Sequence, residues 1–241
     1  MNILSTIVVM ISIGERANLT NYTYPRLAEW ATKHNYNSIL LKKAYNPLKR
    51  APHFNKLQVH RLLPNFDRYI IIDDDLLMSA NAPEMQEVPD GYLGLCKDAE
   101  QRHTEAEHVE WTANTGFIVV TKNSLYLLDQ AYEQGEYSYK CGDGSGKGIW
   151  GPHDQGILND VAFKNKKVYE LDQRWNYQPI LDYFIKDKGW DKWKSSRNYR
   201  LSYYASLLSP FPNKNKNKIS SAYGLHLIRG NYPKFFQRIF K

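Results

Sequence analysis

The stretch "DRYIIIDDDLLMSANAP", from Asp67 to Pro83, decides the fold, because in it an apolar run leads straight into three acidic residues. Tyr, Ile, Ile and Ile occupy positions 69–72, and Asp73, Asp74 and Asp75 follow. Such an apolar run is typical of a buried strand. In an open parallel sheet, ligands bind beyond the carboxyl ends of the strands, so we expect the aspartates to lie at a binding edge.

Three adjacent carboxylates repel one another, and a bound hard cation such as Mg²⁺ or Mn²⁺ would relieve that repulsion. Side chains alternate in direction along an extended chain, so Asp73 and Asp75 should point one way and Asp74 the other. We therefore interpret Asp73 and Asp75 as the functional pair, with Asp74 salt-bridged inward. A simple helix cap is the bland alternative. A phosphatase nucleophile is disfavoured, because Leu77 stands where that chemistry wants a hydroxyl group.

The composition indicates a globular protein. Of 241 residues, 42% are hydrophobic and 14% aromatic, which argues against disorder. No run of eighteen apolar residues predicts a membrane span. The apolar N-terminal segment lacks a basic region and a cleavage site, so we interpret it as a strand rather than a signal peptide. Two cysteines, Cys96 and Cys141, provide no disulfide framework. We expect a cytoplasmic location.

Positive charge is concentrated at one end of the chain. The net charge is +7, and residues 186–241 hold 13 Lys or Arg against 2 Asp or Glu. This asymmetry predicts an anionic partner near that end: a phosphorylated ligand, a membrane surface or a nucleic acid. The run "KNKNK", from Lys214 to Lys218, is typical of a mobile surface loop.

Strand patterns alternate with helix patterns along the chain. We expect strands at 3–13, 37–43, 68–72, 91–96, 116–121 and 167–171. Helices are expected at 24–34, with Pro25 in the first turn, at 54–64, at 123–134 and from Pro152 onward. The glycine-rich segment 141–151 is expected to be a loop, and 172–221 has no clear pattern. The alternation predicts one α/β domain spanning 1–241, with a largely parallel sheet.

Five short segments resemble a known family. The segment "YIIIDDDLL" resembles the D-x-D motif of GT-A fold glycosyltransferases, which use nucleotide-sugar donors. Four further resemblances follow in the family's order: "WTANTGFIVVTK" (111–122), "HDQGILND" (153–160), "DQRWNYQ" (172–178) and "HLIRGNYPKF" (226–235). Together they cover about 70 to 235. They are most similar to retaining enzymes of the glycogenin and galactosyltransferase types, and to small virus-encoded enzymes that decorate capsid proteins.

The resemblance implies a GT-A (nucleotide-diphospho-sugar transferase) fold, a Rossmann-like mixed, mainly parallel sheet flanked by helices. It implies transfer of a sugar from a nucleotide-diphosphate sugar, with a UDP-sugar favoured, to a glycan or protein-linked acceptor. Retention of configuration is favoured. If the enzyme inverts instead, Asp154 is the candidate base.

The resemblance also implies roles for individual residues. Mn²⁺ (or Mg²⁺) would be held by Asp73, Asp75 and His226. The nucleotide and its phosphates would meet Ser12, Gly14, Asp73, Gly230 and Lys234, helped by Arg229. Asn114, Asp154 and Gln155 would bind the donor sugar and take part in the chemistry. The chain departs from glycogenin-like enzymes at residues 231–233, before Lys234, and lacks a Pro-Trp pair after it.

Three further expectations concern partners and nearby segments. A non-catalytic nucleotide-sugar or carbohydrate-binding module on the same fold is the alternative function. Nucleic-acid binding is not expected, because no basic motif with ordered aromatic residues is present. The terminus "KFFQRIFK" (234–241) is expected to form a short amphipathic helix that touches an anionic membrane. Arg16 or Lys56 could meet a phosphate or the base, although both are more typical of surface charges. The glycine-rich loop 142–151 is interpreted as an acceptor-side lid.

Overall fold

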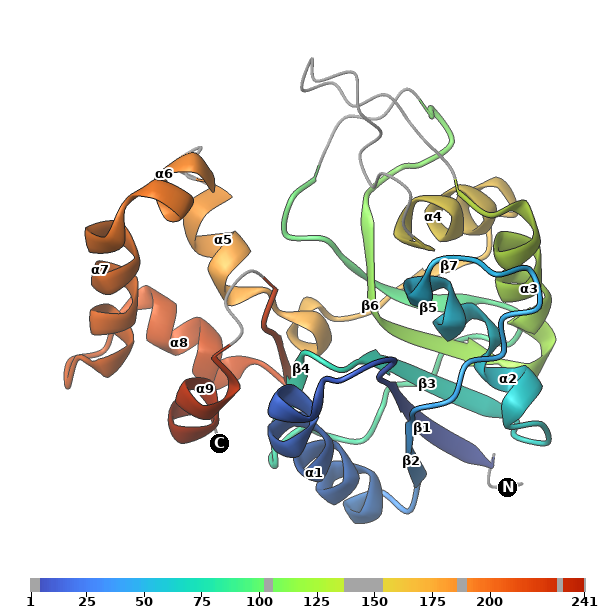
Figure 1. Ribbon diagram of the computed structural model, residues 1–241, viewed down its shortest axis with the longest axis horizontal. Coiled ribbons are helices and arrows are strands. Elements are labelled where there is room, and N and C mark those ends of the chain that lie inside the picture. Colours follow the sequence, from blue (N-terminus) through green and yellow to red (C-terminus); the bar gives the residue numbers. More distant parts are fainter. Residues whose placement is uncertain (1–4, 102–105, 137–153, 186–189, 229–231, 241) are drawn as a thin grey trace.

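A six-stranded sheet forms the centre of the computed structural model, which describes residues 5–101, 106–136, 154–185, 190–228 and 232–240 (Figure 1). Its strand order is β2-β1-β3-β6-β5-β7. The bounds are β1 Thr6–Ile11, β2 Asn37–Leu41, β3 Arg68–Asp73, β5 Leu93–Lys97, β6 Ala113–Thr121 and β7 Val168–Glu170. Only β6 runs against the others, pairing antiparallel with β3 and with β5. The predicted mixed, mainly parallel sheet is confirmed.

Helices cover both faces of this sheet, because successive strand residues point to opposite sides. Val9 and Ile71 pack toward α3 (Leu125–Gln134), α4 (Asp154–Lys164) and the 3₁₀ segment η1 (Pro52–Gln58). Val8 and Ile70 pack on the other face against α1 (Ala17–Lys33). Two shorter elements, α2 (Val59–Leu62) and the 3₁₀ turn η2 (Lys122–Ser124), adjoin η1 and α3. Both faces of the sheet are therefore buried, which explains the continuous apolar runs in its strands.

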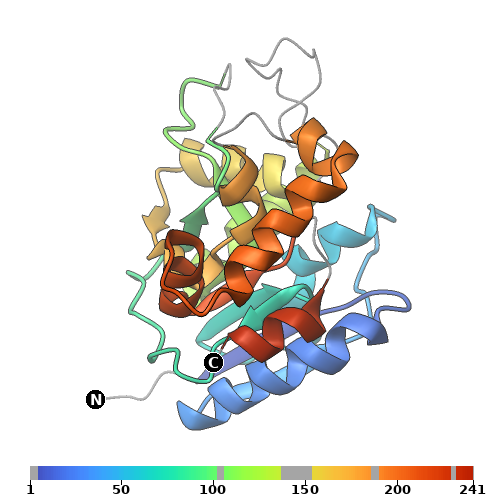
Figure 2. The same cartoon turned by 90° about the vertical axis from the view of Figure 1, so that its left-hand side faces the viewer.

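A helical region with its own core lies beside the sheet (Figures 1 and 2). It contains α5 (Pro179–Ile185), α6 (Trp190–Ser195), α7 (Arg197–Leu208), α8 (Lys214–Ser221) and α9 (Pro233–Ile239). The 3₁₀ turn η3 (Gln173–Asn176) leads into it. A two-stranded antiparallel sheet of β4 (Leu76–Met78) and β8 (Gly224–His226) joins this region to the aspartate segment. The stretch that showed no clear sequence pattern is thus mostly helical.

The structure corrects two local predictions. The run "KNKNK" is not a loop but the first part of α8, whose N-cap Asn213 accepts a hydrogen bond from the backbone N–H of Lys216 at 3.0 Å. Its apolar residue Ile219 is buried, so tertiary packing stabilises a helix that the polar sequence does not predict. Pro25 lies inside α1 rather than in its first turn, because the helix already begins at Ala17. Burial of Leu27 and Trp30 holds that helix despite the hydrogen bond that proline cannot make.

The terminal segment does form a helix, α9, but its apolar side chains face inward. Phe236 and Phe240 are 0% and 1% exposed, and both belong to the core of the helical region. These two side chains are therefore packed inside the protein, while Phe235 and Ile239 are only partly buried. None of the helices in the part of the chain that the structure describes is long and apolar enough to cross a membrane. Pro152 and the glycine-rich segment fall outside the described residues.

Candidate active site

The three adjacent aspartates separate at the turn between β3 and β4. Asp74 is buried and has partners of its own, accepting hydrogen bonds from Ser12 Oγ at 2.7 Å and from Arg16 Nε at 2.5 Å. Its backbone carbonyl accepts from Thr23 Oγ1 at 2.8 Å. These contacts tie the turn to the segment that follows β1. They confirm the interpretation of Asp74 as the structural, inward-paired member. They also show that the Ser12 hydroxyl donates to a protein carboxylate.

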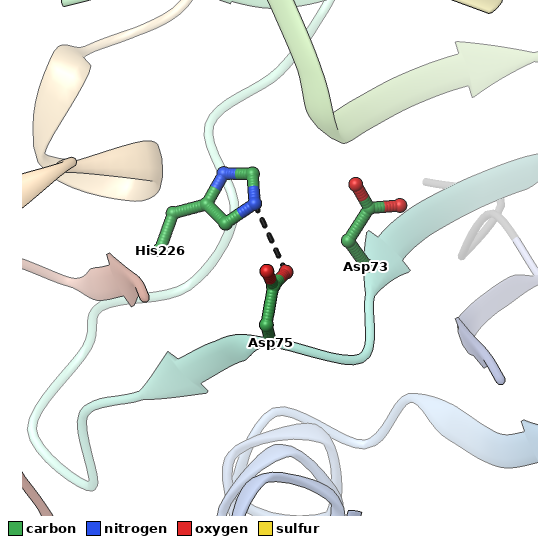
Figure 3. A group of neighbouring side chains, drawn as sticks. All are labelled: Asp73, Asp75 and His226. Atoms are coloured by element: carbon green, nitrogen blue, oxygen red, sulfur yellow. Dashed lines mark ion pairs between the residues drawn. The ribbon is translucent and has the colours of Figure 1, made fainter. Parts of the chain in front are cut away.

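Asp73 and Asp75 converge instead on His226, which comes from β8 (Figure 3). One ligand atom from each of these three residues lies within 4.8 Å of the others. The antiparallel register of β4 and β8 pairs Leu76 with His226, which places the histidine beside the aspartates. His226 Nε2 lies 3.0 Å from Asp75 Oδ1. Two carboxylates and an imidazole form a donor set that suits Mn²⁺ or Mg²⁺, so the residues present fit the implied cation.

A chain of buried amides orients the imidazole of His226. Asn114 Oδ1 accepts the backbone N–H of Gly116 at 2.9 Å, so the neighbouring Asn176 must present its Nδ2 to that same oxygen, at 2.8 Å. The Asn176 Oδ1 therefore faces His226 Nδ1 at 2.8 Å and accepts its proton. This arrangement leaves Nε2 directed at Asp75, where its lone pair could meet a cation. The "RWN" segment thus acts on the site through Asn176.

Gly116 is required by the position of that imidazole. A Cβ atom added at residue 116 would lie 2.1 Å from Cε1 of His226 and 2.5 Å from its Nδ1. Real contacts of that length do not occur, so the ring lies where a side chain would otherwise be. The glycine of the β6 motif therefore makes room for the histidine of β8.

Lys56 neutralises carboxylates inside the site and is not a surface charge. Its side chain is 5% exposed, and Nζ lies 2.6 Å from Asp73 Oδ1 and 3.3 Å from Asp154 Oδ2. It also donates to the backbone carbonyl of Thr115 at 3.1 Å. Burial alone would lower the pKa of this lysine, but the two carboxylates outweigh burial and raise it. Sequence reasoning missed this role because Lys56 comes from a segment far from the motifs.

The two aspartates nearest His226 have shifted pKa values of opposite sign. Burial raises the pKa of Asp73, although Lys56 and His226 oppose the shift. Burial also acts on Asp75, but the neighbouring imidazole prevails and lowers the pKa of this carboxyl. Burial disfavours protonation of His226, yet Asp75 raises the pKa of the imidazole overall. The contact with His226 therefore favours the ionised form of Asp75 despite its burial.

The remaining predicted residues, Asn114, Asp154 and Gln155, line the same cavity. Asp154 Oδ2 accepts the hydroxyl of Thr115 at 2.9 Å. Asn114 Nδ2 and Gln155 Nε2 both donate to Asp98 Oδ2, at 3.0 and 3.1 Å. Asp98 was not predicted. It directly follows β5 just as the aspartate segment follows β3, and that strand-end position is the sequence signal that could have found it.

A cavity of about 730 Å³ connects these groups. It is lined by all three aspartates, His226, Lys56, Asp98, Asn114, Asp154 and Gln155. Its lining at the β1 end includes Ile13 and Arg16, beside Gly14, whose φ of +94° suits glycine at the turn. Neither Ser12 nor the exposed Lys234 lines it. Arg229 and Gly230 lie outside the described residues.

No protein-family model matches the chain, and no curated protein matches it by sequence. Solved structures do match its fold. A glycosyltransferase involved in the glycosylation of the major capsid of PBCV-1 superposes with a TM-score of 0.57 at 12% identity, covering 97% of this chain and 98% of that one.

Two further structures extend this likeness. The galactosyltransferase LgtC, solved with donor and acceptor sugar analogues, superposes with a TM-score of 0.54 at 12% identity, covering 97% of this chain and 94% of LgtC. The glycosyltransferase GlyE of Streptococcus pneumoniae TIGR4 reaches 0.54 at 13% identity, covering 97% of this chain and 60% of GlyE.

These matches establish the class of fold. Over nearly its whole length the chain shares the overall fold of these solved glycosyltransferases, in agreement with the resemblance of its sequence motifs.

Proposed function

We propose that this protein is a divalent-metal-dependent glycosyltransferase. It moves a sugar from a nucleotide-diphosphate sugar, with UDP as the favoured nucleotide, to a glycan or protein-linked acceptor. The observation that carries the proposal is the convergence of Asp73, Asp75 and His226 on one point of a cavity of about 730 Å³. Two carboxylates and an imidazole that meet in a cavity form a donor set for a divalent cation, and such clusters of titratable groups are typical of functional sites.

The metal site and the donor site share the same cavity. Asp73, Asp75 and His226 would hold Mn²⁺ or Mg²⁺. When bound, the cation supplies positive charge against the leaving diphosphate. The relay through Asn176 holds the imidazole in the tautomer that binding needs. The Lys56 ammonium lies between Asp73 and Asp154 and offsets the repulsion between these two carboxylates.

Donor-sugar binding would fall to Asn114, Gln155 and Asp154, with Asp98 behind them. Their amide and carboxylate groups line the cavity and suit sugar hydroxyls. Asp98 fixes the two amides by accepting from both. The amide oxygens and nitrogens are therefore pre-oriented before any substrate arrives.

The surroundings of Asp154 favour retention of configuration. Its Oδ2 accepts the Thr115 hydroxyl at 2.9 Å and lies 3.3 Å from the Lys56 ammonium. An oxygen held in this way is poorly placed to take a proton from an acceptor, which inversion would require. The leaving phosphate can accept that proton on the same face of the sugar. The anomeric configuration of the product, read by NMR, distinguishes the two outcomes.

The proposal is tested by release of UDP from a panel of UDP-sugars with Mn²⁺ or Mg²⁺. We expect activity with at least one donor, complete loss in excess chelator, and a fall of at least about a thousandfold in Asp75→Ala, as expected when charge stabilisation is removed. The matched control is Asp172→Asn, which removes a partly exposed carboxylate paired with Arg174 outside the cavity.

Two results would contradict the proposal. Full activity in excess chelator would show that the reaction needs no divalent metal. Tight donor binding without turnover on any acceptor would identify a binding module instead.

A further inference from the structure

A surface on the helical region remains unexplained by sugar transfer. Helix α7 buries Tyr199, Tyr203 and Leu207 against its neighbours. Its opposite face carries a second apolar stripe, Leu201, Ala205 and Leu208, which are all exposed. Because these positions are four and three residues apart, they lie on one side of the helix. Helix α7 therefore has two apolar stripes, and the described part of the chain covers only one of them.

The turn after α7 extends this stripe. Phe211 stands between two prolines in the sequence Pro-Phe-Pro, and it is 75% exposed, more than any other large hydrophobic residue that the structure describes. Its backbone N–H donates to Ser209 Oγ at 3.2 Å, and Asn213 Nδ2 donates to the carbonyl of Ser206 at 2.6 Å. The turn is therefore held in place, and Phe211 is presented to solvent by a fixed scaffold.

The surroundings of this stripe are basic. Arg197 and Lys214 flank it, both exposed and without an ion pair among the described residues. Of the described residues in 190–240, only Asp191 is acidic, and it already pairs with Lys194 at 2.9 Å. A second copy of the same surface would bring like charges together, which disfavours self-association. Exposed leucine and phenylalanine among cations match an anionic lipid surface, which offers both hydrocarbon and negative charge.

We propose that the outer face of α7 and the Phe211 turn dock the protein on anionic membranes. Leu201, Leu208 and Phe211 enter the boundary between head groups and acyl chains, while Arg197 and Lys214 meet the phosphates. A cavity of about 270 Å³ adjoins the stripe and shares Leu208 with it; its other lining residues include Leu207, Ile219 and Ile239. This surface differs from the terminal helix expected from the sequence, where Phe236 is buried.

The test is flotation of the whole protein with vesicles of phosphatidylcholine alone or mixed with phosphatidylserine. We expect binding only to the mixed vesicles, and binding that weakens as salt is raised. Phe211→Ser and Leu208→Gln should each weaken binding about tenfold, because each removes apolar area that would leave water. Lys214→Glu should weaken it by about fivefold or more.

The matched control is Leu48→Gln. Leu48 is 52% exposed, close to the value of Leu201, but it lies in the segment between β2 and η1. Its substitution should leave vesicle binding unchanged. Metal-dependent UDP release without vesicles should be equal in all these variants, so a failure of docking is separable from a failure of the proposed enzyme activity.

Three results would overturn the proposal. They are absence of wild-type flotation with the mixed vesicles, equal binding to neutral vesicles, and a loss in Leu48→Gln as large as that in Phe211→Ser. Fluorine NMR of labelled phenylalanine can measure the solvent exposure of Phe211. Protection of Phe211 only in the presence of the mixed vesicles would support the proposal directly.

Discussion

At the scale of single residues, each of the three aspartates is defined by the partner it meets. Asp74 is held by Arg16 and Ser12, while Asp75 faces His226. Alternation along the chain predicts that the middle carboxylate turns away, and the structure agrees. The partners themselves were not predictable from that stretch, because contacts between distant segments leave no local pattern.

Asn176 should control metal affinity without touching the metal. Replacing it by alanine leaves the Nδ1–H of His226 without its acceptor and frees the imidazole to rotate. We expect Asn176→Ala to weaken Mn²⁺ binding by about tenfold to a hundredfold, the usual cost of losing such an orienting partner. Isothermal titration calorimetry on the folded variant measures this affinity.

Asn159→Ala is the control for that experiment. Asn159 is equally buried, and its amide bonds the backbone of Ala113 at 2.8 and 2.9 Å. We expect its loss to reduce stability by roughly 1–3 kcal/mol while Mn²⁺ affinity stays near that of the wild type. If Asn176→Ala bound Mn²⁺ as tightly as the wild type, the orienting role would be wrong.

At the scale of elements, the segment formed by η1 and α2 carries Lys56 into the site and is anchored on α3. Asp129 of α3 accepts from Gln58 Nε2 and meets His60 Nε2, both at 3.0 Å, and it pairs with Arg61 Nη2 at 2.6 Å. The sequence predicts a helical segment here. It does not predict that one of its lysines is buried, because no periodicity distinguishes that lysine from surface charges.

His60 should make stability depend on pH. Burial lowers the pKa of its imidazole, although Asp129 opposes the shift. Its Nδ1 is buried and has no hydrogen-bond partner among the described residues, so a proton there would lack an acceptor. The unfolded state therefore binds the proton more readily. The contribution of His60 to the unfolding free energy should be fully present above the ordinary histidine pKa of about 6.5, and it should decrease as the pH drops below that value.

Urea unfolding at pH 7.5, 6 and 5 tests this expectation against His60→Gln, which keeps a donor toward Asp129 but cannot titrate. As the pH falls, the unfolding free energy of the wild type should decrease relative to that of the variant. The shift is at most about 1.4 kcal/mol for each unit by which the pKa is lowered. A difference that is constant across the three pH values would contradict the argument.

At the scale of the whole molecule, the site lies where the sheet meets the helical region. The pairing of β4 with β8 connects them, and Leu77 of β4 belongs to the core of the helical region. The three candidate metal ligands lie at this junction. A bound cation would therefore add a link between the two regions, which also meet where α1 contacts α9.

Ligand binding should consequently stabilise the whole fold. Mn²⁺ with UDP at about a hundredfold over their dissociation constants should add about 2.7 kcal/mol to the unfolding free energy and raise Tm. Differential scanning calorimetry should show this rise in the wild type and in the control Asp172→Asn, but not in Asp75→Ala. An equal rise in Asp75→Ala would place the ligand elsewhere. A normal rise with no sugar transfer would favour the binding module.

The sequence by itself determined the fold class, the approximate positions of the six strands of the main sheet and of several helices, and a set of candidate site residues. Apolar runs, strand-end aspartates and five ordered motifs are local features, so they can be recognised without coordinates. They predicted the mixed sheet and singled out Asp73, Asp75 and His226, which the structure brings together.

Only the tertiary structure decided which charges are buried together and which apolar faces are covered. Lys56 and Asp98 belong to the site because of packing between distant segments, and Asn176 because β8 places His226 beside it. The apolar face of α9 is covered, whereas the outer stripe of α7 is exposed. Burial depends on which neighbour covers a side chain, and that neighbour comes from another part of the chain.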